Sequence, residues 1–396
     1  MKSKKVKLPA ASFGASARRR VMMVTGEVSG DLHGAHLMEA VHRINPGIQF
    51  SGMGGEALKK AGMNLLYPNQ SLSVVGITEV LLKLKAIRKT LHGLKQFLER
   101  EQPDLLILID FPDFNLRLAK FAHRRGIPVL YYISPQVWAW RPGRVKLIAR
   151  WVKKMVVFFP FEVPIYKAAG VDVECVGHPL LDVVKPSRSK EETAKQLGLD
   201  PAKPIVGLLP GSRSQELERL LPVLLDTARL LHQENPDLQF VIPLAPGLTK
   251  ESVARWMNNA WVRVTLAEGQ TYDVMNLSDL LIMASGTATL EAALLGKPMV
   301  IIYKVSPLSY WVGRALVRVK HIGLVNLVAG KGIAPELIQK DASPEKIAQE
   351  ALRILNDPNV LQGMTEAMIQ VRQNLGEPGA VERAACIVTS MLENGN

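Results

Sequence analysis

Short aliphatic runs alternate along the chain with longer stretches that carry the apolar spacing of helices. The clearest run is Leu105–Ile109, which consists of aliphatic residues only, ends in Asp110 and is followed by Pro112. So short a run, bounded by polar residues, predicts a strand buried on both faces of a parallel sheet. Residues 115–126 have helical spacing, so this region predicts a strand, a turn and a helix.

The same alternation occurs in both halves of the chain. Strands are expected at residues 21–24, 48–51, 105–109, 129–133, 154–159 and 173–176, and then at 205–209, 240–244, 262–265, 280–284 and 298–303. Strands that alternate with helices are typical of doubly wound sheets. We therefore predict an α/β protein with two Rossmann-like, doubly wound domains and a cleft between them.

Composition predicts where these domains begin and end. Residues 1–20 are rich in Lys, Ala, Ser and Arg and are expected to form a disordered basic tail. The first domain is predicted to span 21–184 and the second 205–378. Residues 185–204 are rich in Pro, Lys, Ser and Glu and contain no long apolar run, which indicates an interdomain linker.

Bulk composition and charge limit the class of protein. An apolar content of 47% in 396 residues suffices for two folded cores and excludes a disordered protein. No apolar run reaches the roughly 18–20 residues of a membrane span, no signal-peptide core is present, and two cysteines suit a reducing compartment, so we predict a cytosolic chain. The net charge of +13 favours anionic lipid or phosphorylated partners, with simple solubility as the alternative. Nucleic acid ranks last, because its recognition signatures are absent.

Asp110 is the first candidate for chemistry. Open α/β sheets bind ligands beyond the carboxyl ends of their strands, so this residue is expected on the rim of the cleft. An isolated charge is costly to bury, which favours a chemical role. The alternative is a helix cap, but Asp113 suits that role better because it lies closer to the helical segment.

A glycine-bearing turn at residues 26–31 follows the first predicted strand. Its small residues would let backbone N–H groups face an anion, although a plain strand–helix turn also needs glycine. Glu27 is unexpected in a purely structural turn, because it would face Asp110 in the cleft. Residues 52–57 formally fit the dinucleotide-binding fingerprint but follow the second strand, so we interpret them as a turn.

Two turns in the second half suit a diphosphate. The first contains Gly211, Ser212 and Arg213, and an arginine offers phosphate a fork of donors. The alternative is an ion pair between Arg213 and Glu216 or Glu218. Of these two interpretations we favour phosphate binding.

The second turn contains Ser285, Gly286 and Thr287 at the start of a predicted helix. Glu291, about one turn later, could accept hydrogen bonds from ribose hydroxyls. A capping box with Thr287 as the cap uses the same residue types and is the alternative. Taken together, the two turns predict a nucleotide diphosphate bound to the second domain.

Residues 74–98 combine an apolar helical face with interleaved basic side chains. This pattern is typical of a membrane-surface helix, and a buried helix with a solvated basic face is the alternative. The surplus positive charge favours lipid. The residues that we assign to acceptor or membrane contact are Gly30, Val74, Val75, Leu81, Leu82, Lys83, Lys85 and Arg88.

Six motifs follow one another with a spacing that resembles one known family. They are Gly-Glu-Val-Ser-Gly-Asp at 26–31, Ile-Asp-Phe-Pro-Asp-Phe-Asn at 109–115, Ser-Pro-Gln-Val-Trp-Ala-Trp at 134–140, Gly-His-Pro at 177–179, Leu-Pro-Gly-Ser-Arg at 209–213 and Ser-Gly-Thr-Ala-Thr-Leu-Glu at 285–291. This set resembles the lipid-A-disaccharide synthases, inverting glycosyltransferases of Gram-negative lipid A biosynthesis. The likeness covers roughly residues 21–390.

The resemblance implies a GT-B fold and a reaction between two acylated sugars. The donor would be UDP-2,3-diacylglucosamine and the acceptor 2,3-diacylglucosamine 1-phosphate (lipid X), giving a β-1,6-linked disaccharide 1-phosphate and UDP. It implies peripheral attachment to the cytoplasmic face of the inner membrane, allows a homodimer, and needs no metal and no cofactor. The final helix, 379–396, would return to the first domain.

The resemblance also assigns roles to residues of the second domain. The family's important arginine would correspond to Arg213 and a functional asparagine to Asn326, which we therefore predict to contact substrate. By likeness to GT-B transferases, Glu291 would hold the ribose, and Gly286 with Thr287 the diphosphate. Arg213 and a helix N-terminus can stabilise the negative charge of leaving UDP without a metal.

The base aspartate of the family would correspond to Asp110. A sugar hydroxyl is a poor nucleophile at neutral pH, so an ionised carboxylate can take its proton as attack proceeds. Whether Glu27 competes with Asp110 as the base stays open. Two other classes of function also stay open: a UDP-sugar 2-epimerase of the same architecture, and a membrane adaptor, which would leave the two phosphate-type turns unexplained.

Overall fold

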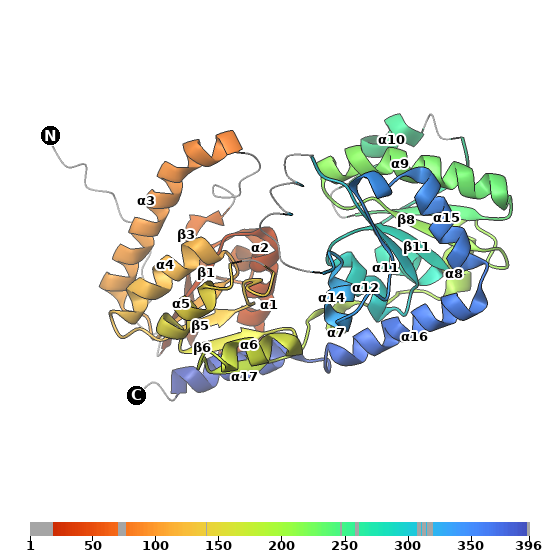
Figure 1. Ribbon diagram of the computed structural model, residues 1–396. Helices are drawn as coiled ribbons and strands as arrows, with labels where there is room; N and C mark the ends of the chain where they lie inside the picture. Colours follow the sequence, from red (N-terminus) through yellow and green to blue (C-terminus); the bar gives the residue numbers. More distant parts are fainter. Residues whose placement is uncertain are drawn as a thin grey trace. The chain divides into compact units, whose positions relative to one another are not determined.

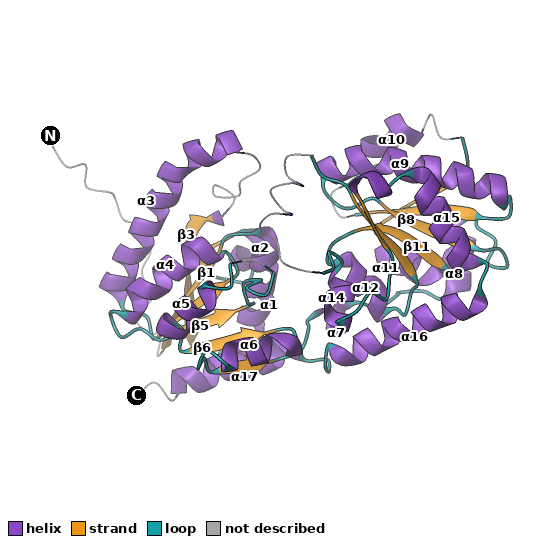
Figure 2. Ribbon diagram, viewed as in Figure 1, coloured by secondary structure: helices purple, strands orange, loops and turns teal. Residues whose placement is uncertain are grey.

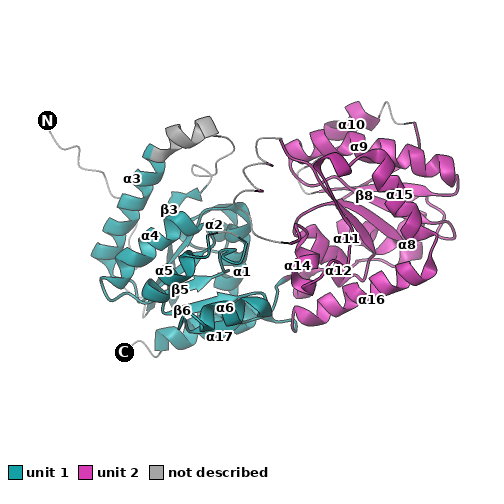
Figure 3. Cartoon of the chain, in the orientation of Figure 1, with its two compact units in different colours: residues 1–179, 377–396 teal, residues 180–376 magenta. Residues whose placement is uncertain are grey.

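The chain folds into two compact units, which Figure 3 colours separately. The computed structural model describes residues 19–69, 77–139, 141–245, 248–257, 261–306, 310, 314 and 320–393, without the side chains of 77–84. Unit 1 comprises Met1–Pro179 and Glu377–Asn396, and unit 2 comprises Leu180–Gly376. Each unit is a sheet flanked by helices (Figures 1 and 2).

Unit 1 contains a seven-stranded parallel sheet in the order β3-β2-β1-β4-β5-β6-β7. Its strands are β1 (Arg19–Thr25), β2 (Ile48–Gly54), β3 (Asn64–Pro68), β4 (Leu105–Ile109), β5 (Val129–Tyr132), β6 (Lys154–Val157) and β7 (Val173–Cys175). Its helices are α1 (Val28–Ile44), α2 (Glu56–Lys60), α3 (Ile77–Glu101), α4 (Pro112–His123), α5 (Arg144–Trp151), α6 (Val163–Lys167) and α17 (Ala380–Glu393). The strand predicted at 105–109 is confirmed as β4 and is fully buried.

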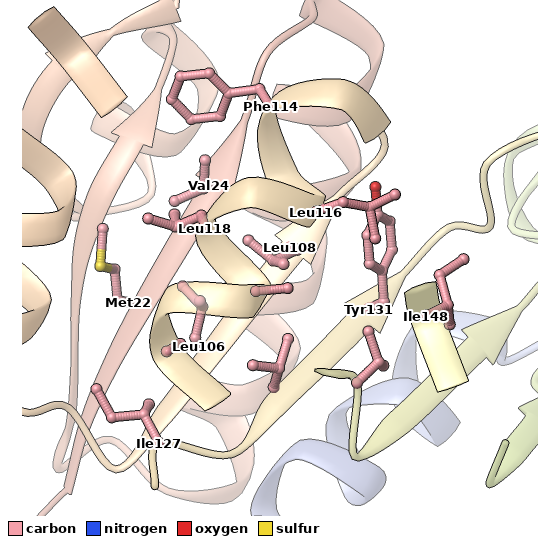
Figure 4. Packing of buried hydrophobic residues seen from close by; sticks show 14 of the residues in the cluster. Met22, Val24, Leu106, Leu108, Phe114, Leu116, Leu118, Ile127, Tyr131 and Ile148 are labelled. Atoms are coloured by element: carbon pink, nitrogen blue, oxygen red, sulfur yellow. The ribbon is translucent and has the colours of Figure 1, made fainter. Parts of the chain in front are cut away.

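The alternation of side chains along β1 and β4 gives unit 1 a core on each face of the sheet. Met22 and Leu106 point to the face covered by α3, α4 and α5 (Figure 4). Met23 and Ile107 point to the opposite face, which α1, α2 and α17 cover. Burial of aliphatic side chains on both faces explains why β4 carries no polar residue until it ends.

Helix α17 belongs to unit 1 although it follows unit 2 in the sequence. It packs against α1, with Ala384 and Val388 in the shared core. The guanidinium of Arg383 donates hydrogen bonds to the carbonyl oxygen of Val176, at 3.0 and 2.6 Å. The last helix of the chain is therefore part of unit 1, where it covers one face of the sheet.

Unit 2 contains a six-stranded parallel sheet in the order β10-β9-β8-β11-β12-β13. Its strands are β8 (Ile205–Leu209), β9 (Gln239–Leu244), β10 (Val264–Glu268), β11 (Leu280–Ala284), β12 (Met299–Tyr303) and β13 (Glu336–Ile338). Its helices are α7 (Leu180–Val183), α8 (Lys190–Leu197), α9 (Ser214–Glu234), α10 (Lys250–Met257), α11 (Thr271–Leu277), α12 (Ala288–Leu294), α14 (Leu324–Ala329), α15 (Pro344–Leu355) and α16 (Pro358–Asn374).

The segment 185–204, which composition predicts as a linker, is instead an integral part of unit 2. Helix α8 packs against α11. The buried carboxylate of Asp273 accepts hydrogen bonds from the Ser187 N–H (2.5 Å), the Ser187 hydroxyl (2.6 Å) and the Arg188 N–H (3.0 Å). Polar side chains anchor this segment, which a search for apolar runs does not detect.

The strand order of both sheets reverses at one point, between β1 and β4 in unit 1 and between β8 and β11 in unit 2. Loops that leave the carboxyl ends of two such strands diverge to opposite faces and open a crevice there. Four turns that the sequence predicts to be functional follow these four strands. They lie at 26–31, 110–115, 211–213 and 285–291. The topology thus places the candidate residues at two equivalent positions.

Candidate active site

Asp110 lies directly after β4 in a strained backbone conformation. Both Asp110 and Phe111 have a φ of +46°, a left-handed conformation that non-glycine residues rarely adopt. The amide of Asn115 donates to the carbonyl oxygens of Ile109 (3.1 Å) and Asp110 (2.7 Å), and the Tyr131 hydroxyl donates to the latter (2.6 Å). Strain held in place by one buried and two partly buried hydrogen bonds is typical of a functional turn.

The turn after β1 packs against this strained loop. A Cβ atom on Gly26 would collide with the ring of Phe111, so only glycine allows the close approach. Gly30 is buried within α1, and a Cβ there would collide with the hydroxyl of Thr25. Its position favours helix packing and not the acceptor contact that we predicted. Glu27, by contrast, is exposed at the start of α1.

The surroundings of Asp110 change its acidity. Burial and the negative charge of Glu27 raise its pKa to about 6, while the N–H of Phe111 and the charge of Arg144 act in the opposite direction. The carboxyl is therefore ionised at neutral pH and is a stronger base than an exposed aspartate. The negative charge of Glu27 therefore acts on the Asp110 carboxyl, although Glu27 is not among the residues that line the Asp110 cavity.

Asp110 lies on a cavity of about 310 Å³ in unit 1. Other lining residues are Ser134, Trp138, Arg144, Phe159 and Glu162. Sequence reasoning identified 134–140 as a motif but assigned no role to Arg144 and Glu162. Both side chains are charged and nearly buried, with exposed fractions of 5% for Arg144 and 3% for Glu162. In the sequence, the signal that could have identified them is a charged residue next to apolar residues in a turn between a strand and a helix.

The turn at 52–57, which fits the dinucleotide-binding fingerprint, binds a carboxylate of the protein itself. The carboxylate of Asp31 accepts hydrogen bonds from the N–H groups of Gly55 (2.5 Å), Ala57 (2.9 Å) and Leu58 (3.4 Å). A bound pyrophosphate would need these same donors. The interpretation as a structural turn therefore agrees with the geometry.

The two phosphate-type turns of unit 2 meet in one cavity of about 360 Å³. The predicted residues that line it are Gly211, Ser212, Arg213, Ser285, Gly286, Thr287 and Glu291. Gly211 has a φ of +106°, which glycine adopts at little cost. Because these residues come from the loops after β8 and β11 and, for Glu291, from the first turn of α12, the topology brings together what the sequence separates by about seventy positions.

The Gly211 turn already binds an anion, the side chain of Glu216. One carboxylate oxygen accepts hydrogen bonds from the N–H groups of Ser212 (3.0 Å) and Arg213 (3.2 Å), and the other accepts one from the Arg213 guanidinium (2.9 Å). Of the two ion pairs considered from the sequence, the structure contains this one, whereas Glu218 pairs with Arg255. The side chain of Arg213 is nevertheless 82% exposed.

The second turn offers a hydroxyl that does not serve as a cap. Thr287 occupies the N-cap position of α12 without a side-chain capping bond, so the capping-box alternative is not what the structure contains. Ser285 donates its hydroxyl hydrogen to the carbonyl oxygen of Ile322, at 3.0 Å. Burial raises the pKa of the Glu291 carboxyl on the same cavity.

Asn326 differs from the prediction that it contacts substrate. Its side chain is fully buried and lies outside the residues that line the cavity. The amide nitrogen donates to the oxygens of Ala334 (2.8 Å) and Glu336 (2.7 Å), and the amide oxygen accepts from the N–H groups of Ile333 (2.8 Å) and Ala334 (2.9 Å). With every donor and acceptor position used, its geometry favours a positioning role.

The predicted membrane helix corresponds to α3, of which the structure describes part. Val74 and Val75, and the side chains of Leu81, Leu82 and Lys83, lie outside the described residues. Lys85 and Arg88 are exposed. The later residues Leu94, Phe97 and Leu98 are buried in the core of unit 1, so this half of α3 is a core helix with a basic outer face.

The residues that the structure describes contain neither a metal-binding cluster nor a membrane-spanning helix. Within them, no group of three or more His, Cys, Asp and Glu side chains is arranged to hold a metal ion. The helices that the structure describes also include none with the length and apolar character needed to cross a membrane.

Solved structures define the class to which this two-sheet fold belongs. MurG from Acinetobacter baumannii superposes with a TM-score of 0.59 at 17% identity, covering 94% of this chain and 99% of that one. A UDP-GlcNAc 2-epimerase from Neisseria meningitidis, bound to UDP-GlcNAc, gives 0.59 at 14% identity, with 95% and 100% covered. The fold is GT-B, as predicted, and transferases and epimerases share it.

Comparison of the amino-acid sequence with known proteins identifies the family within this fold. The family model for lipid-A-disaccharide synthetase matches residues 21–391. Lipid-A-disaccharide synthase from Geobacter sulfurreducens is 50% identical over 94% of this chain and 97% of its own length, and that from Syntrophus aciditrophicus is 50% identical over 95% and 98%. The chain belongs to the lipid-A-disaccharide synthetase family and is a glycosyltransferase. This membership favours the transferase over the epimerase alternative.

Proposed function

We propose that the protein transfers 2,3-diacylglucosamine from its UDP derivative to 2,3-diacylglucosamine 1-phosphate, forming the β-1,6-linked lipid A disaccharide 1-phosphate and UDP. The observation that carries this proposal is the family match over residues 21–391. Two cavities of opposite chemistry support it, because a glycosyl transfer needs both a site for an anionic leaving group and a base.

The nucleotide of the donor would occupy the cavity of unit 2. Ser212 and Arg213 would bind the diphosphate with the same N–H and guanidinium donors that now hold Glu216. Gly286 and Thr287 would approach the diphosphate from the turn that precedes α12, and Glu291 would accept hydrogen bonds from the ribose. Arg213 would then stabilise the charge of departing UDP, so that the reaction proceeds without a metal ion.

The acceptor sugar would occupy the cavity of unit 1, with its attacking hydroxyl at Asp110. The carboxylate of Asp110 takes the hydroxyl proton while the oxygen attacks the anomeric carbon of the donor and the bond to UDP breaks. A single in-line displacement inverts the configuration at that carbon. Glu27 raises the basicity of Asp110 in this scheme and does not itself take the proton.

Both substrates carry acyl chains, so the enzyme must approach a lipid surface. We propose that it binds the cytoplasmic face of the inner membrane peripherally through the first half of α3. The exposed Lys85 and Arg88 support this orientation, because basic side chains are attracted to anionic headgroups.

Incubation of the purified protein with both diacyl substrates in detergent tests the proposal. We expect mass spectrometry to detect the disaccharide phosphate, with one UDP released for each disaccharide and with unchanged turnover after treatment with a chelator. UDP-sugar turnover without an acyl acceptor would instead support an epimerase, and loss of activity with the chelator would exclude the metal-free mechanism.

A further inference from the structure

The cavity of unit 1 contains a second carboxyl group, Glu162, that the proposed chemistry does not use. It lies at the end of the short helical turn Pro160–Glu162, which follows β6. Its carboxyl accepts hydrogen bonds from the indole N–H of Trp138 (3.3 Å) and the backbone N–H of Phe159 (3.3 Å). Among the residues that the structure describes, burial and hydrogen bonds act on the pKa of this carboxyl, and no cation does.

A buried carboxylate without a cation is costly and needs an explanation. Neutral donors, namely the Ser134 hydroxyl, the Trp138 indole and the backbone N–H groups of Phe158 and Phe159, compensate only part of the lost hydration. A leucine or methionine would fill the same volume without this cost. Glu162 is not sealed in the core, because it lines the same cavity as Asp110. It is therefore accessible to a ligand that occupies the cavity.

The rest of the lining has the composition of a sugar-binding site. Trp138 and Phe159 both pack against the ring of Phe161, at centroid distances of 5.5 and 5.3 Å, which fixes their orientation. Aromatic side chains next to carboxyl groups suit a pyranose ring, which has apolar C–H faces and polar O–H edges. The volume of about 310 Å³ suits one ring and its nearest substituents.

We propose that Glu162 binds the acceptor sugar by accepting a hydrogen bond from one of its hydroxyl or amide groups, and so directs the attacking hydroxyl toward Asp110. This inference rests on the proposed function, because it assumes that the unit 1 cavity receives the acceptor. Asp110 then takes the proton, whereas Glu162 orients the sugar.

The two carboxyl groups would act over different pH ranges. Burial raises the pKa of Glu162 to about 7, against hydrogen bonds that lower it, and the pKa of Asp110 is about 6. The charged and titratable groups around them are Glu27 at the start of α1, Tyr131 on β5, Arg144 on α5, Tyr166 on α6 and Cys175 on β7. The pKa values of the Tyr166 and Cys175 side chains are raised, which keeps both neutral near pH 7. Acceptor binding should therefore strengthen as pH rises through about 7.

The variant Glu162→Gln tests this role, because it keeps the shape of the side chain and removes its charge. Steady-state kinetics would be measured between pH 6 and 8.5 with each substrate varied in turn. We expect the KM for the acceptor to rise at least tenfold, and its dependence on pH near 7 to disappear. The KM for the donor and the Kd for UDP should stay unchanged. Glu174→Gln, an exposed glutamate of the same unit that pairs with Lys154, is the matched control.

Several outcomes would overturn the proposal. An acceptor KM and pH profile like those of the wild type would show that Glu162 does not bind the sugar, and equal losses of acceptor and UDP binding would show a general structural role. If the variant does not fold, acceptor binding to the wild-type protein saturated with UDP is measured by calorimetry between pH 6 and 8. An affinity for the acceptor that is constant over this range would contradict the proposal. A wild-type protein that binds the acceptor but makes no disaccharide would contradict the proposed function alone.

Discussion

The two units share one topology but differ in the chemistry at the point where strand order reverses. In unit 1 the loops after β1 and β4 carry the carboxyl groups of Glu27 and Asp110, whereas in unit 2 the loops after β8 and β11 carry glycine, hydroxyl groups and Arg213. Unit 1 therefore presents a base and unit 2 presents donors for an anion. The fold determines where a ligand can bind, and a few loop residues determine which ligand it is.

The backbone contributes to this difference. Helix α4 begins at Pro112, which has no N–H, so its N-terminus offers one donor fewer to an anion. Helix α9 begins after Ser212 and Arg213, whose N–H groups both bind a carboxylate. Unit 2 reaches the left-handed conformation with Gly211, whereas unit 1 imposes it on Asp110 and Phe111 at a cost in strain.

The largest effect is expected at the base. Asp110→Asn keeps the shape of the side chain but removes its ability to accept a proton, so turnover should fall roughly a hundred- to ten-thousand-fold. Product formation with both substrates measures this loss. Asp104→Asn, at the opposite end of β4, is the matched control and should change turnover less than about threefold. Turnover of Asp110→Asn near that of the control would remove Asp110 from the mechanism.

Loss of the Arg213 guanidinium, which lines the cavity of unit 2, should weaken nucleotide binding. Arg213→Ala removes a charged hydrogen bond worth about 1.5–3 kcal/mol, which corresponds to a rise in the Kd for UDP of about tenfold or more. Calorimetric titration with UDP measures it, with Arg255→Ala on α10 as the control. Unchanged UDP affinity in Arg213→Ala would contradict the placement of the diphosphate.

A smaller effect is expected from Glu27, and it distinguishes the two candidate bases. Activity should fall below about pH 6, where Asp110 becomes protonated. Because the charge of Glu27 raises this pKa, Glu27→Gln should shift the acidic limb of the pH–rate profile to lower pH by a fraction of a unit. A loss of activity as large as that of Asp110→Asn would instead identify Glu27 as the base.

The smallest effect is expected from Glu216, whose carboxylate occupies the N–H donors of the Gly211 turn. Glu216 must leave the donors of Ser212 and Arg213 when a diphosphate binds, so Glu216→Gln should tighten UDP binding by about two- to fivefold. The same change weakens the cap of α9 and should cost about 1 kcal/mol of stability. Calorimetry and thermal unfolding measure the two effects. Weaker UDP binding in this variant would show that Glu216 supports the site and does not compete for it.

The sequence predicted the strands that carry apolar runs and missed two of the edge strands. The strands with continuous apolar runs were predicted near their observed positions, whereas the edge strands β3 and β13 were missed because their residues are largely half-buried and mixed in polarity. The segment 185–204 was misassigned for a related reason, since its anchors are hydrogen bonds to Asp273. Apolar periodicity does not detect contacts of this kind.

The candidate site was predictable where a residue follows a strand directly. Asp110, Arg213 and Thr287 all occupy such turns, and the topology brings them to the two reversal points. Glu162 and Arg144 were missed because their role depends on burial across the sheet. Asn326 shows the converse: the resemblance assigned it a functional role, and only the structure shows its four hydrogen bonds within unit 2.

Hydrogen exchange with mass spectrometry would test the division between the two units most directly. We predict that UDP alone slows exchange in residues 209–216 and 284–291 of unit 2, and that addition of the acceptor slows exchange in residues 110–115, 134–138 and 158–162 of unit 1. Protection of the unit 1 segments by UDP, with no change at 209–216 and 284–291, would contradict the assignment of the nucleotide to unit 2 and of the base to unit 1.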